Sequence, residues 1–152
     1  MFIDDDLVNF LKSCYSIGGN CIYITDLENV RGFCKNKFEE FNKPISKELF
    51  QTILNISIDG YSGAFIMINE KNKIIPVFED SSLNIDWKAQ IILPIWYDDS
   101  IHGTIIFTNF HKTFLEKHLE FAKITQKFVK IILLKQINKN YIEEEKVDEE
   151  EW

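Results

Sequence analysis

The spacing of apolar residues predicts a helix at each end of the chain. Asp4 to Asp6 supply an N-cap and the negative charge that stabilises a helix start, and Gly18-Gly19 ends this first helix, which covers residues 4–16. Its apolar side chains share one face: Leu7, Val8, Leu11, Cys14 and Tyr15. The last helix opens with a capping box, Thr113 to Glu116, and its pattern continues to about Tyr141.

The middle of the chain carries strand patterns on either side of one shorter helix. Residues 21–25 and 30–34 are apolar segments separated by a polar turn, which is typical of two strands. The shorter helix follows Pro44, with Ser46 as its N-cap, and ends near Ser57. The side chains expected to be buried on this helix are Leu49, Phe50, Ile53 and Leu54.

Residues 89–97 and 101–108 form the clearest pattern, a hairpin around the turn Asp98 to Ser100. Their near-continuous apolar character predicts strands that are covered on both faces. With Tyr97 opposite Ile101, alternation assigns an aliphatic face to the terminal helices: Ile91, Leu93, Ile95, Ile101, Gly103, Ile105 and Phe107, where Gly103 lets a helix approach. The other face mixes apolar and polar groups: Gln90, Ile92, Pro94, Trp96, His102, Thr104, Ile106 and Thr108.

Ahead of this hairpin, residues 64–69 and 73–78 are expected to form two more strands. The second contains Pro76, which has no N–H to donate, so we place it at a sheet edge. The order of elements predicts an α+β fold, a central antiparallel sheet with the N- and C-terminal helices packed on one face. We expect a single domain over residues 1–142, followed by a solvated acidic tail over residues 143–152.

Composition and charge narrow the class of protein. The chain has 152 residues, 45% of them apolar and 13 of them Phe, which is enough for one well-packed domain and excludes general disorder. A net charge of −7 argues against direct nucleic-acid binding. The sequence shows no secretory signal and no apolar run long enough to span a membrane, and its three cysteines suggest no disulfide framework. We therefore expect a cytoplasmic protein.

The residues that invite catalytic or metal chemistry each have a simpler structural interpretation. Gly60 to Ala64 only loosely matches a nucleophile elbow, and Asp98-Asp99 is interpreted as a turn. The cysteines are expected to be small buried side chains, and the histidines to be surface or capping residues, without metal-ligand spacing: Cys14, Cys21, Cys34, His102, His111 and His118. We predict no enzyme, no catalytic residue, no metal and no cofactor.

The segments Ile92 to Ile95, Asp98 to Gly103 and Thr104 to Phe107, followed at once by a long helix, resemble the final hairpin of GAF domains. Cys21 to Asp26 together with Pro44 to Ser46 are similar to the C-terminal GAF-like sensor domain of the regulator stage V sporulation protein T. The resemblance implies a link to sporulation and a ligand on the sheet face opposite the terminal helices. It also implies a sensor module without a DNA-binding domain, because the chain starts at the first GAF helix.

This second sheet face is the candidate ligand site. Polar and aromatic groups from three strands are expected to meet there: Tyr23, Thr25, Gln90, Ile92, Trp96 and Thr104. Arg31 is placed near the pocket mouth, where it could bind a carboxylate or phosphate or else pair with Asp26 or Glu28. The alternative is a filled second core in which the Gln and Thr side chains bond to each other inside the protein.

The terminal helices carry more apolar surface than one sheet face can cover. We predict a twofold homodimer in which the first and last helices of two copies form a four-helix bundle. The expected interface residues are Phe10, Phe121, Ile124, Phe128 and Ile131. The alternative is that the chain's own second helix covers this surface.

Together these features predict a small-molecule-sensing regulatory domain, dimeric through its terminal helices. Ligand binding would shift the helix arrangement. The alternative function is a ligand-free dimerisation or adaptor module, whose protein partner would contact the acidic tail. A third, enzymatic function would depend on Cys21 and Cys34.

Overall fold

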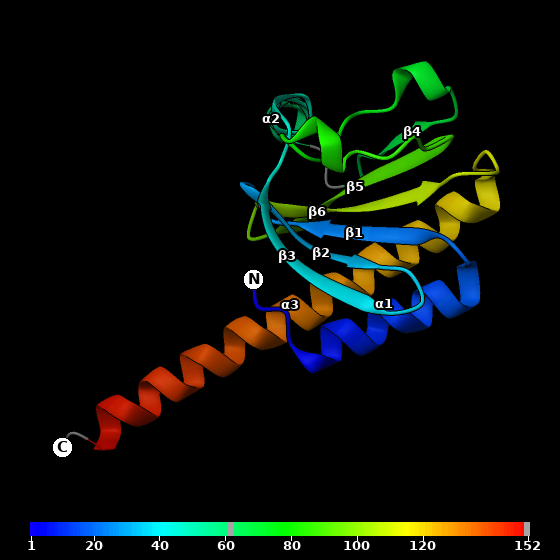
Figure 1. Cartoon of the computed structure of the whole chain (residues 1–152). Coiled ribbons are helices and arrows are strands. Elements are labelled where there is room, and N and C mark those ends of the chain that lie inside the picture. The colour runs from blue at the N-terminus through cyan, green and yellow to red at the C-terminus, as the bar shows by residue number, and fades with distance from the viewer. Residues whose placement is uncertain (61–62, 151–152) are drawn as a thin grey trace.

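Two terminal helices cover one face of a six-stranded sheet, and a shorter helix lies over the other face (Figure 1). The computed structural model describes the backbone of residues 1–60 and 63–150, and the side chains of residues 1–60 and 63–139. The strand order is β3-β2-β1-β6-β5-β4, and all neighbours are antiparallel. The elements are α1 (Asp5–Gly18), β1 (Cys21–Thr25), β2 (Asn29–Cys34), β3 (Phe38–Pro44), α2 (Lys47–Asp59), β4 (Ile66–Ile68), η1 (Lys71–Lys73), η2 (Ser81–Leu83), β5 (Ala89–Tyr97), β6 (Ser100–Asn109) and α3 (Glu116–Glu150). The predicted α+β class is confirmed.

Side-chain caps define the starts of α1 and α2 as predicted. An Asp4 carboxylate oxygen accepts a hydrogen bond from the Leu7 N–H at 2.9 Å, and the Ser46 hydroxyl accepts one from the Leu49 N–H at 2.9 Å. The buried residues of α2 are Leu49, Ile53 and Ile56. Phe50 and Leu54 were predicted to be buried but are 44% and 39% exposed. The helix is rotated so that positions i, i+4 and i+7 face the sheet, which turns the other two outward.

Two predictions about strands were wrong. The edge strand β3 was missed, because its repeated charged and polar residues hide the alternation that identifies a strand. Residues 73–78 do not form a strand. Lys73 ends η1, and the segment contacts the chain before α2 through the bridge between Ile45 and Phe78 and the bond from the Ser46 N–H to the Val77 carbonyl oxygen. The side chain of Gln90 bonds to this segment where a neighbouring strand would otherwise pair with it. The Gln90 amide accepts from the Ile75 N–H and donates to the Ile75 carbonyl oxygen, both at 2.9 Å.

The tip of the β5–β6 hairpin also differs from the prediction. The turn is formed by Asp98 and Asp99 alone, both with positive φ (55° and 59°), so Tyr97 pairs with Ser100. A register shift then restores the predicted pairing from Ile95 inward. As a result, Ile101 packs on the α2 side and His102 lies beside Tyr97 on the terminal-helix side, the reverse of the prediction.

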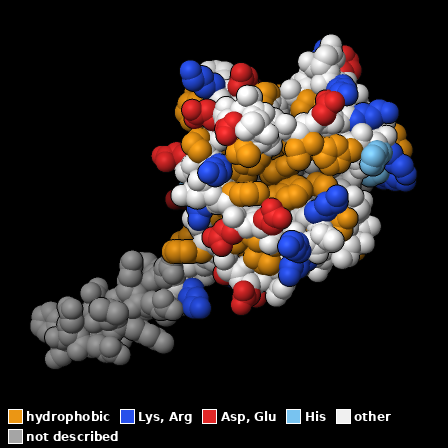
Figure 2. Space-filling model, in the orientation of Figure 1, with side chains coloured by type: hydrophobic (Ala, Val, Ile, Leu, Met, Phe, Trp, Pro, Cys, Tyr) orange, Lys and Arg blue, Asp and Glu red, His pale blue; other side chains and the backbone are white. Residues whose placement is uncertain are grey.

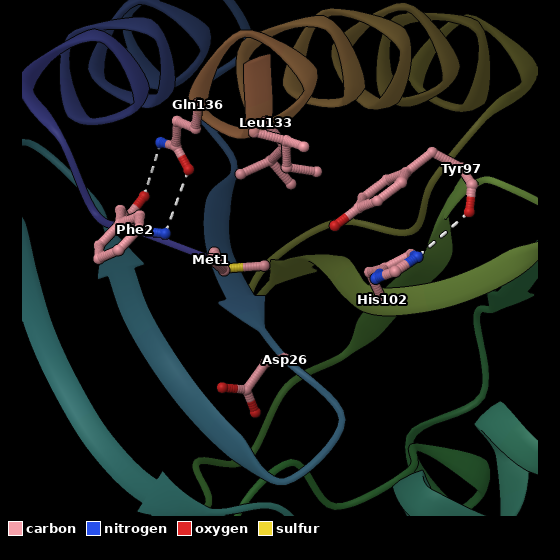
Figure 3. Close-up of a pocket in the computed structure, with 8 residues that line it drawn as sticks. Met1, Phe2, Asp26, Tyr97, His102, Leu133 and Gln136 are labelled. Atoms are coloured by element: carbon pink, nitrogen blue, oxygen red, sulfur yellow. Dashed lines mark hydrogen bonds between the residues drawn. The ribbon is translucent and has the colours of Figure 1, made fainter. Parts of the chain in front are cut away.

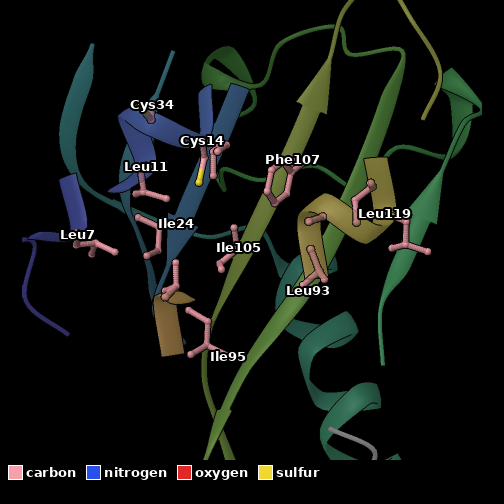
Figure 4. Packing of buried hydrophobic residues seen from close by; sticks show 14 of the residues in the cluster. Leu7, Leu11, Cys14, Ile24, Cys34, Leu93, Ile95, Ile105, Phe107 and Leu119 are labelled. Atoms are coloured by element: carbon pink, nitrogen blue, oxygen red, sulfur yellow. The ribbon is translucent and has the colours of Figure 1, made fainter. Parts of the chain in front are cut away.

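Two apolar cores lie on the two faces of the sheet. The core under α1 and α3 includes the predicted aliphatic hairpin residues (Figure 4): Leu7, Leu11, Ile24, Leu93, Ile95, Ile105, Phe107 and Leu119 are among its members. The core under α2 contains Tyr23, Leu49, Ile53, Phe78, Trp87, Ile92 and Ile106, among others. The prediction that Gly103 lets a helix approach was wrong. A Cβ there would lie 2.0 Å from the Thr25 carbonyl oxygen, so this glycine allows close approach of β1.

The start of α3 uses a different cap from the one predicted. The helix begins at Glu116, and the Leu115 N–H donates to Nδ1 of His118 at 2.8 Å, so the Thr113–Glu116 capping box was wrong. The Asn69 amide also binds the Phe114 N–H and carbonyl oxygen, at 2.7 and 3.0 Å. The backbone of α3 stays helical through Glu150, beyond the predicted end, and this last part projects away from the sheet (Figure 1). No helix in the described part of the chain is long and apolar enough to cross a membrane.

Candidate functional site

Most of the predicted ligand residues lie on the α2 side of the sheet, but several are bonded to one another or to the protein. Gln90 is fully buried, and its amide holds the Ile75 backbone. The Thr25 and Thr104 hydroxyls, also buried, form a hydrogen bond of 2.7 Å. These are the internal contacts expected for a filled second core. Any ligand on this face would therefore rest against walls that Gln90 and the two threonines position.

Tyr23 belongs to an aromatic cluster on the same face. Its ring centroid lies 4.6 Å from that of Phe33, 5.8 Å from that of Phe78 and 5.5 Å from that of Trp87. Burial raises the pKa of the Tyr23 phenol well above its usual range, so the hydroxyl is neutral at all physiological pH values. The cluster forms an apolar floor between β1 and the segment that leads into β5.

Trp96 has the one unsatisfied group of this face. Its ring packs against the core under α2, opposite Ile101. Among the described residues, its Nε1 is the only buried side-chain nitrogen or oxygen without a hydrogen-bond partner. Leaving such a donor unpaired costs about 1–3 kcal/mol. An acceptor atom of a bound molecule or of water would remove that cost, which makes Trp96 the strongest candidate for a ligand contact among the described residues of this face.

Arg31 does not join the other predicted ligand residues. It extends toward the N-terminal segment, where its Nη1 lies 3.1 Å from an Asp26 carboxylate oxygen and 3.3 Å from the Met1 carbonyl oxygen. Burial acts to raise the pKa of Asp26, but hydrogen bonds from the Asn29 and Glu28 N–H groups and from Arg31 outweigh it and lower this pKa. Pairing with Asp26 was the alternative to ligand binding that the sequence left open for Arg31.

A small pocket that the sequence did not reveal lies on the terminal-helix side (Figure 3). It has a volume of about 140 Å³ and is lined by Met1, Phe2, Asp26, Tyr97, His102, Leu133, Gln136 and Ile137. The Gln136 amide forms hydrogen bonds of 3.1 and 2.8 Å with the Phe2 backbone, and the Tyr97 and His102 rings stack at 3.5 Å. At this volume the pocket is smaller than typical ligand sites, which measure roughly 300–1,000 Å³.

The pocket was missed because its residues come from four distant segments, and the shifted hairpin tip is what brings His102 to this side. His102 Nε2 lies 3.1 Å from the Tyr97 carbonyl oxygen, so this nitrogen carries the proton and donates. No pattern in the sequence links Met1, Asp26 and Gln136.

The cysteines are all buried and free in the structure. Burial raises the pKa of all three thiols, that of Cys34 to about 11, so they remain protonated and unreactive at neutral pH. Among the described residues no group of three His, Cys, Asp or Glu side chains could hold a metal ion. Of the loop Gly60 to Ala64, Tyr61 and Ser62 lie outside the described residues.

The apolar stripe of the terminal helices is largely uncovered within one chain. Ile124, Phe128 and Ile131 are each about half exposed on α3, and the Phe128 ring lies 5.5 Å from that of Phe10 on α1. Phe121 is partly buried against Phe107. Because α2 packs on the opposite face of the sheet, the alternative that α2 covers this stripe was wrong.

Comparisons with known proteins identify the fold. No family model matches the sequence, and no curated protein is significantly similar to it. Among solved structures, the cofactor-binding GAF domain of the nutrient sensor CodY from Clostridium difficile gives a TM-score of 0.59 at 16% identity, over 88% of this chain and 86% of that one. The PixJ GAF domain of Thermosynechococcus elongatus, in its blue-light-absorbing form, gives 0.54 at 10% identity over 90% of each chain.

A free methionine-R-sulfoxide reductase from Neisseria meningitidis gives a TM-score of 0.47 at 17% identity, over 80% of this chain and 74% of that one. The first two matches show that this chain has the fold of GAF domains, as the hairpin predicted. The similarity to stage V sporulation protein T, with its link to sporulation, stays a prediction.

Proposed function

We propose that this chain is a regulatory domain that senses a small molecule on the α2 side of its sheet. The observation that carries the proposal is the unpaired Trp96 Nε1, a buried donor on the face opposite the terminal helices. The fold supports it, since one of the similar structures is described as the cofactor-binding GAF domain of a nutrient sensor. We also expect the protein to be cytoplasmic and not to bind nucleic acid directly, given its free thiols and its net charge of −7.

The ligand would present a hydrogen-bond acceptor to Trp96 and an apolar surface to the aromatic cluster around Tyr23 and to Ile92. Gln90, Thr25 and Thr104 shape the site through their bonds within the protein, which makes them positioning residues. Arg31 takes no part in this site because it pairs with Asp26 on the other side of the sheet. The domain would bind its ligand without converting it.

The response would pass through a homodimer. Two copies that join their apolar stripes, formed by the exposed Ile124, Phe128 and Ile131 and the partly buried Phe10 and Phe121, would build a four-helix bundle from α1 and α3. A ligand that favours one bundle arrangement shifts the population toward it by its differential affinity. The projecting end of α3 would carry that change to a partner.

A second function, a ligand-free dimerisation or adaptor module, is favoured by the internal hydrogen bonds of Gln90 and of the Thr25–Thr104 pair. In that case the Trp96 donor would be satisfied by water. The two functions differ in whether any small molecule stabilises the fold.

A thermal-shift screen of metabolites tests the proposal. A true ligand at 100 times its Kd raises the free energy of unfolding by about 2.7 kcal/mol. Trp96→Phe keeps an aromatic ring but removes the donor, so it should weaken a hit about tenfold or more. Tyr97→Phe, which removes a hydroxyl on the opposite face, is the matched control and should leave the affinity unchanged. The absence of any hit, or hits that Trp96→Phe leaves unchanged, would favour the adaptor function.

A further inference from the structure

A second pocket, independent of the proposed sensing site, lies at the end of the sheet where α1 leads into β1 and β6 leads into α3. Its volume is about 290 Å³. The side chains that matter for its chemistry are Asn20, Asn109, His111, Lys112, Thr113 and His118. Its lining contains no Asp or Glu, although the chain as a whole carries a net charge of −7. The local charge is thus opposite to that of the protein.

Asn109 builds the wall of this pocket. Its Oδ1 accepts hydrogen bonds from the His111 and Lys112 N–H groups at 2.9 and 2.8 Å, which fixes the turn after β6. Its Nδ2 donates to Oδ1 of Asn20 at 2.9 Å. The bonds around Asn109 hold the basic loop against the start of β1, so the pocket is built by defined contacts.

Asn20 offers a hydrogen-bond donor to this pocket. Its side chain is only 6% exposed, and its Oδ1 is already bonded to Asn109. No hydrogen bond joins its Nδ2 to another described residue, and the residue lines the pocket. Because this N–H is not fully enclosed, it can be reached from the pocket and can donate to a bound molecule.

The other lining groups are donors as well. Because His118 Nδ1 accepts from the Leu115 N–H, the proton of the neutral ring sits on Nε2, which can only donate. Burial lowers the pKa of His118, and the nearby Lys117 and Lys112 lower it further. Histidine and lysine side chains gather at this end of the molecule, on the right in Figure 2.

We propose that this pocket binds a phosphate group, free or carried by a small metabolite. Lys112 supplies the charge, while Asn20 Nδ2, His118 Nε2 and the Thr113 hydroxyl supply hydrogen bonds to its oxygens. The carboxyl end of α1 reaches the pocket at Gly18 and Gly19 and brings about half a negative charge. The full positive charge of Lys112 outweighs it. The site would add a second input to the domain, next to the start of α3.

An NMR titration of the full chain with inorganic phosphate tests this site, with acetate at equal ionic strength as the comparison. Phosphate should give saturable shifts of the Asn20 side-chain amide and of the residues around Lys112, and acetate should not. Lys112→Gln should weaken binding about tenfold or more through loss of a charge-assisted bond. Lys37→Gln, which removes an exposed lysine of the β2–β3 turn, is the matched control and should bind like the wild type.

Asn20→Asp is a second variant that keeps the acceptor for Asn109 but replaces the free donor by a negative charge. It should abolish the saturable shifts while leaving the folded spectrum intact. Glycerol phosphate in place of inorganic phosphate tells a metabolite site from a free-phosphate site. Equal effects of Lys112→Gln and Lys37→Gln, shifts that do not saturate, or equal binding of acetate would overturn the proposal. None of these results bears on Trp96, so the sensing site is tested separately.

Discussion

The two faces of the sheet are covered in different ways. On one face, the regular helices α1 and α3 pack aliphatic side chains such as Leu11 and Val129 onto the sheet, and these are fully buried. On the other face, α2 is joined by the irregular segment 69–88, which contains only two short turns of 3₁₀ helix. The first covering depends on buried apolar area. The second also buries apolar side chains, Val77, Phe78 and Trp87 among them, but side-chain hydrogen bonds hold its backbone in place of a helix or a strand ladder. We therefore expect it to open at a lower cost than global unfolding.

Asn84 shows how the irregular segment is held. Its Oδ1 accepts from the Val77 and Phe78 N–H groups at 3.0 and 2.8 Å, and its Nδ2 donates to the Phe78 carbonyl oxygen at 2.9 Å. Together with Gln90, this side chain takes the place of a neighbouring strand. To separate from the sheet, the segment would lose these side-chain bonds and its backbone contacts with Ile45 and Ser46, but no pairing between the named strands, which suits a face that must admit a ligand.

The largest expected effect comes from truncating the core under the terminal helices. Leu93→Ala leaves a cavity beneath α3 and should lower the free energy of unfolding by about 2–5 kcal/mol, as buried leucines generally do. Urea denaturation measures this loss. Leu115→Ala, which truncates an exposed leucine just before α3, is the control and should change the stability by less than about 0.5 kcal/mol. Equal losses would contradict the assignment of the main core to this face.

The next effect concerns pairing of two copies. Phe128→Glu places a charge at the centre of the proposed interface and should raise the dimer dissociation constant by about 30-fold or more, as loss of a hot spot does. Sedimentation velocity over a range of concentrations measures it. Ile58→Glu, at a highly exposed apolar position on α2, should leave the dimer intact. A wild-type chain that stays monomeric at all concentrations would end the dimer proposal.

Removal of the Gln90 amide should have a smaller and more local effect. Gln90→Met keeps the volume of the side chain but leaves the Ile75 N–H and carbonyl oxygen without partners, at a cost of about 1–3 kcal/mol. Hydrogen exchange should speed up within residues 73–78 and stay unchanged in β1. Gln51→Met, on the exposed side of α2, is the control. Uniform acceleration across the whole sheet would show that Gln90 does not act locally.

The smallest effect is a pH dependence at the start of α3. Burial lowers the pKa of His118 below its ordinary value of 6.5, and Lys117 and Lys112 lower it further. The unfolded chain therefore takes up this proton at a higher pH than the folded chain, so stability falls as the pH drops below 6.5. His118→Gln keeps an acceptor for the Leu115 N–H but does not titrate. Its urea midpoint should decline less than that of the wild type over the same pH range, and parallel curves would refute the cap's role.

The sequence predicted the regular elements well and the irregular ones poorly, for identifiable reasons. Side-chain alternation and capping chemistry depend on residues close together in the chain. They predicted the spans of β1 and β5, the Asp4 and Ser46 caps and the faces of the inner part of the hairpin. The edge strand β3 was missed because its residues are mostly polar and charged, although its partner β2 directly precedes it in the chain. Residues 73–78 were taken for a strand because their apolar content does not show that a side chain would replace the partner.

The sequence predicted on which side of the sheet the candidate site lies, but not which of its side chains are bonded within the protein. Alternation placed Gln90, Thr104 and Trp96 on one face, and the structure agrees. Which of them is already bonded depends on distant partners such as Ile75, which no local pattern reveals. The reversal of Ile101 and His102 came from a turn shorter by one residue. Arg31 follows Val30, which belongs to the core under α2, and lies on the opposite face, where it pairs with Asp26.

Hydrogen exchange of the unliganded wild type, resolved residue by residue, tests the difference between the two faces most directly. We predict that the amides of Ile75, Val77 and Phe78 exchange by local opening, well before those of β1 and of the buried stretch of β5. Their rates should be insensitive to Leu93→Ala, which speeds only global unfolding. Exchange of these three amides at the rate of global unfolding would contradict the account, because the α2 face would then be as fixed as the face under α1 and α3.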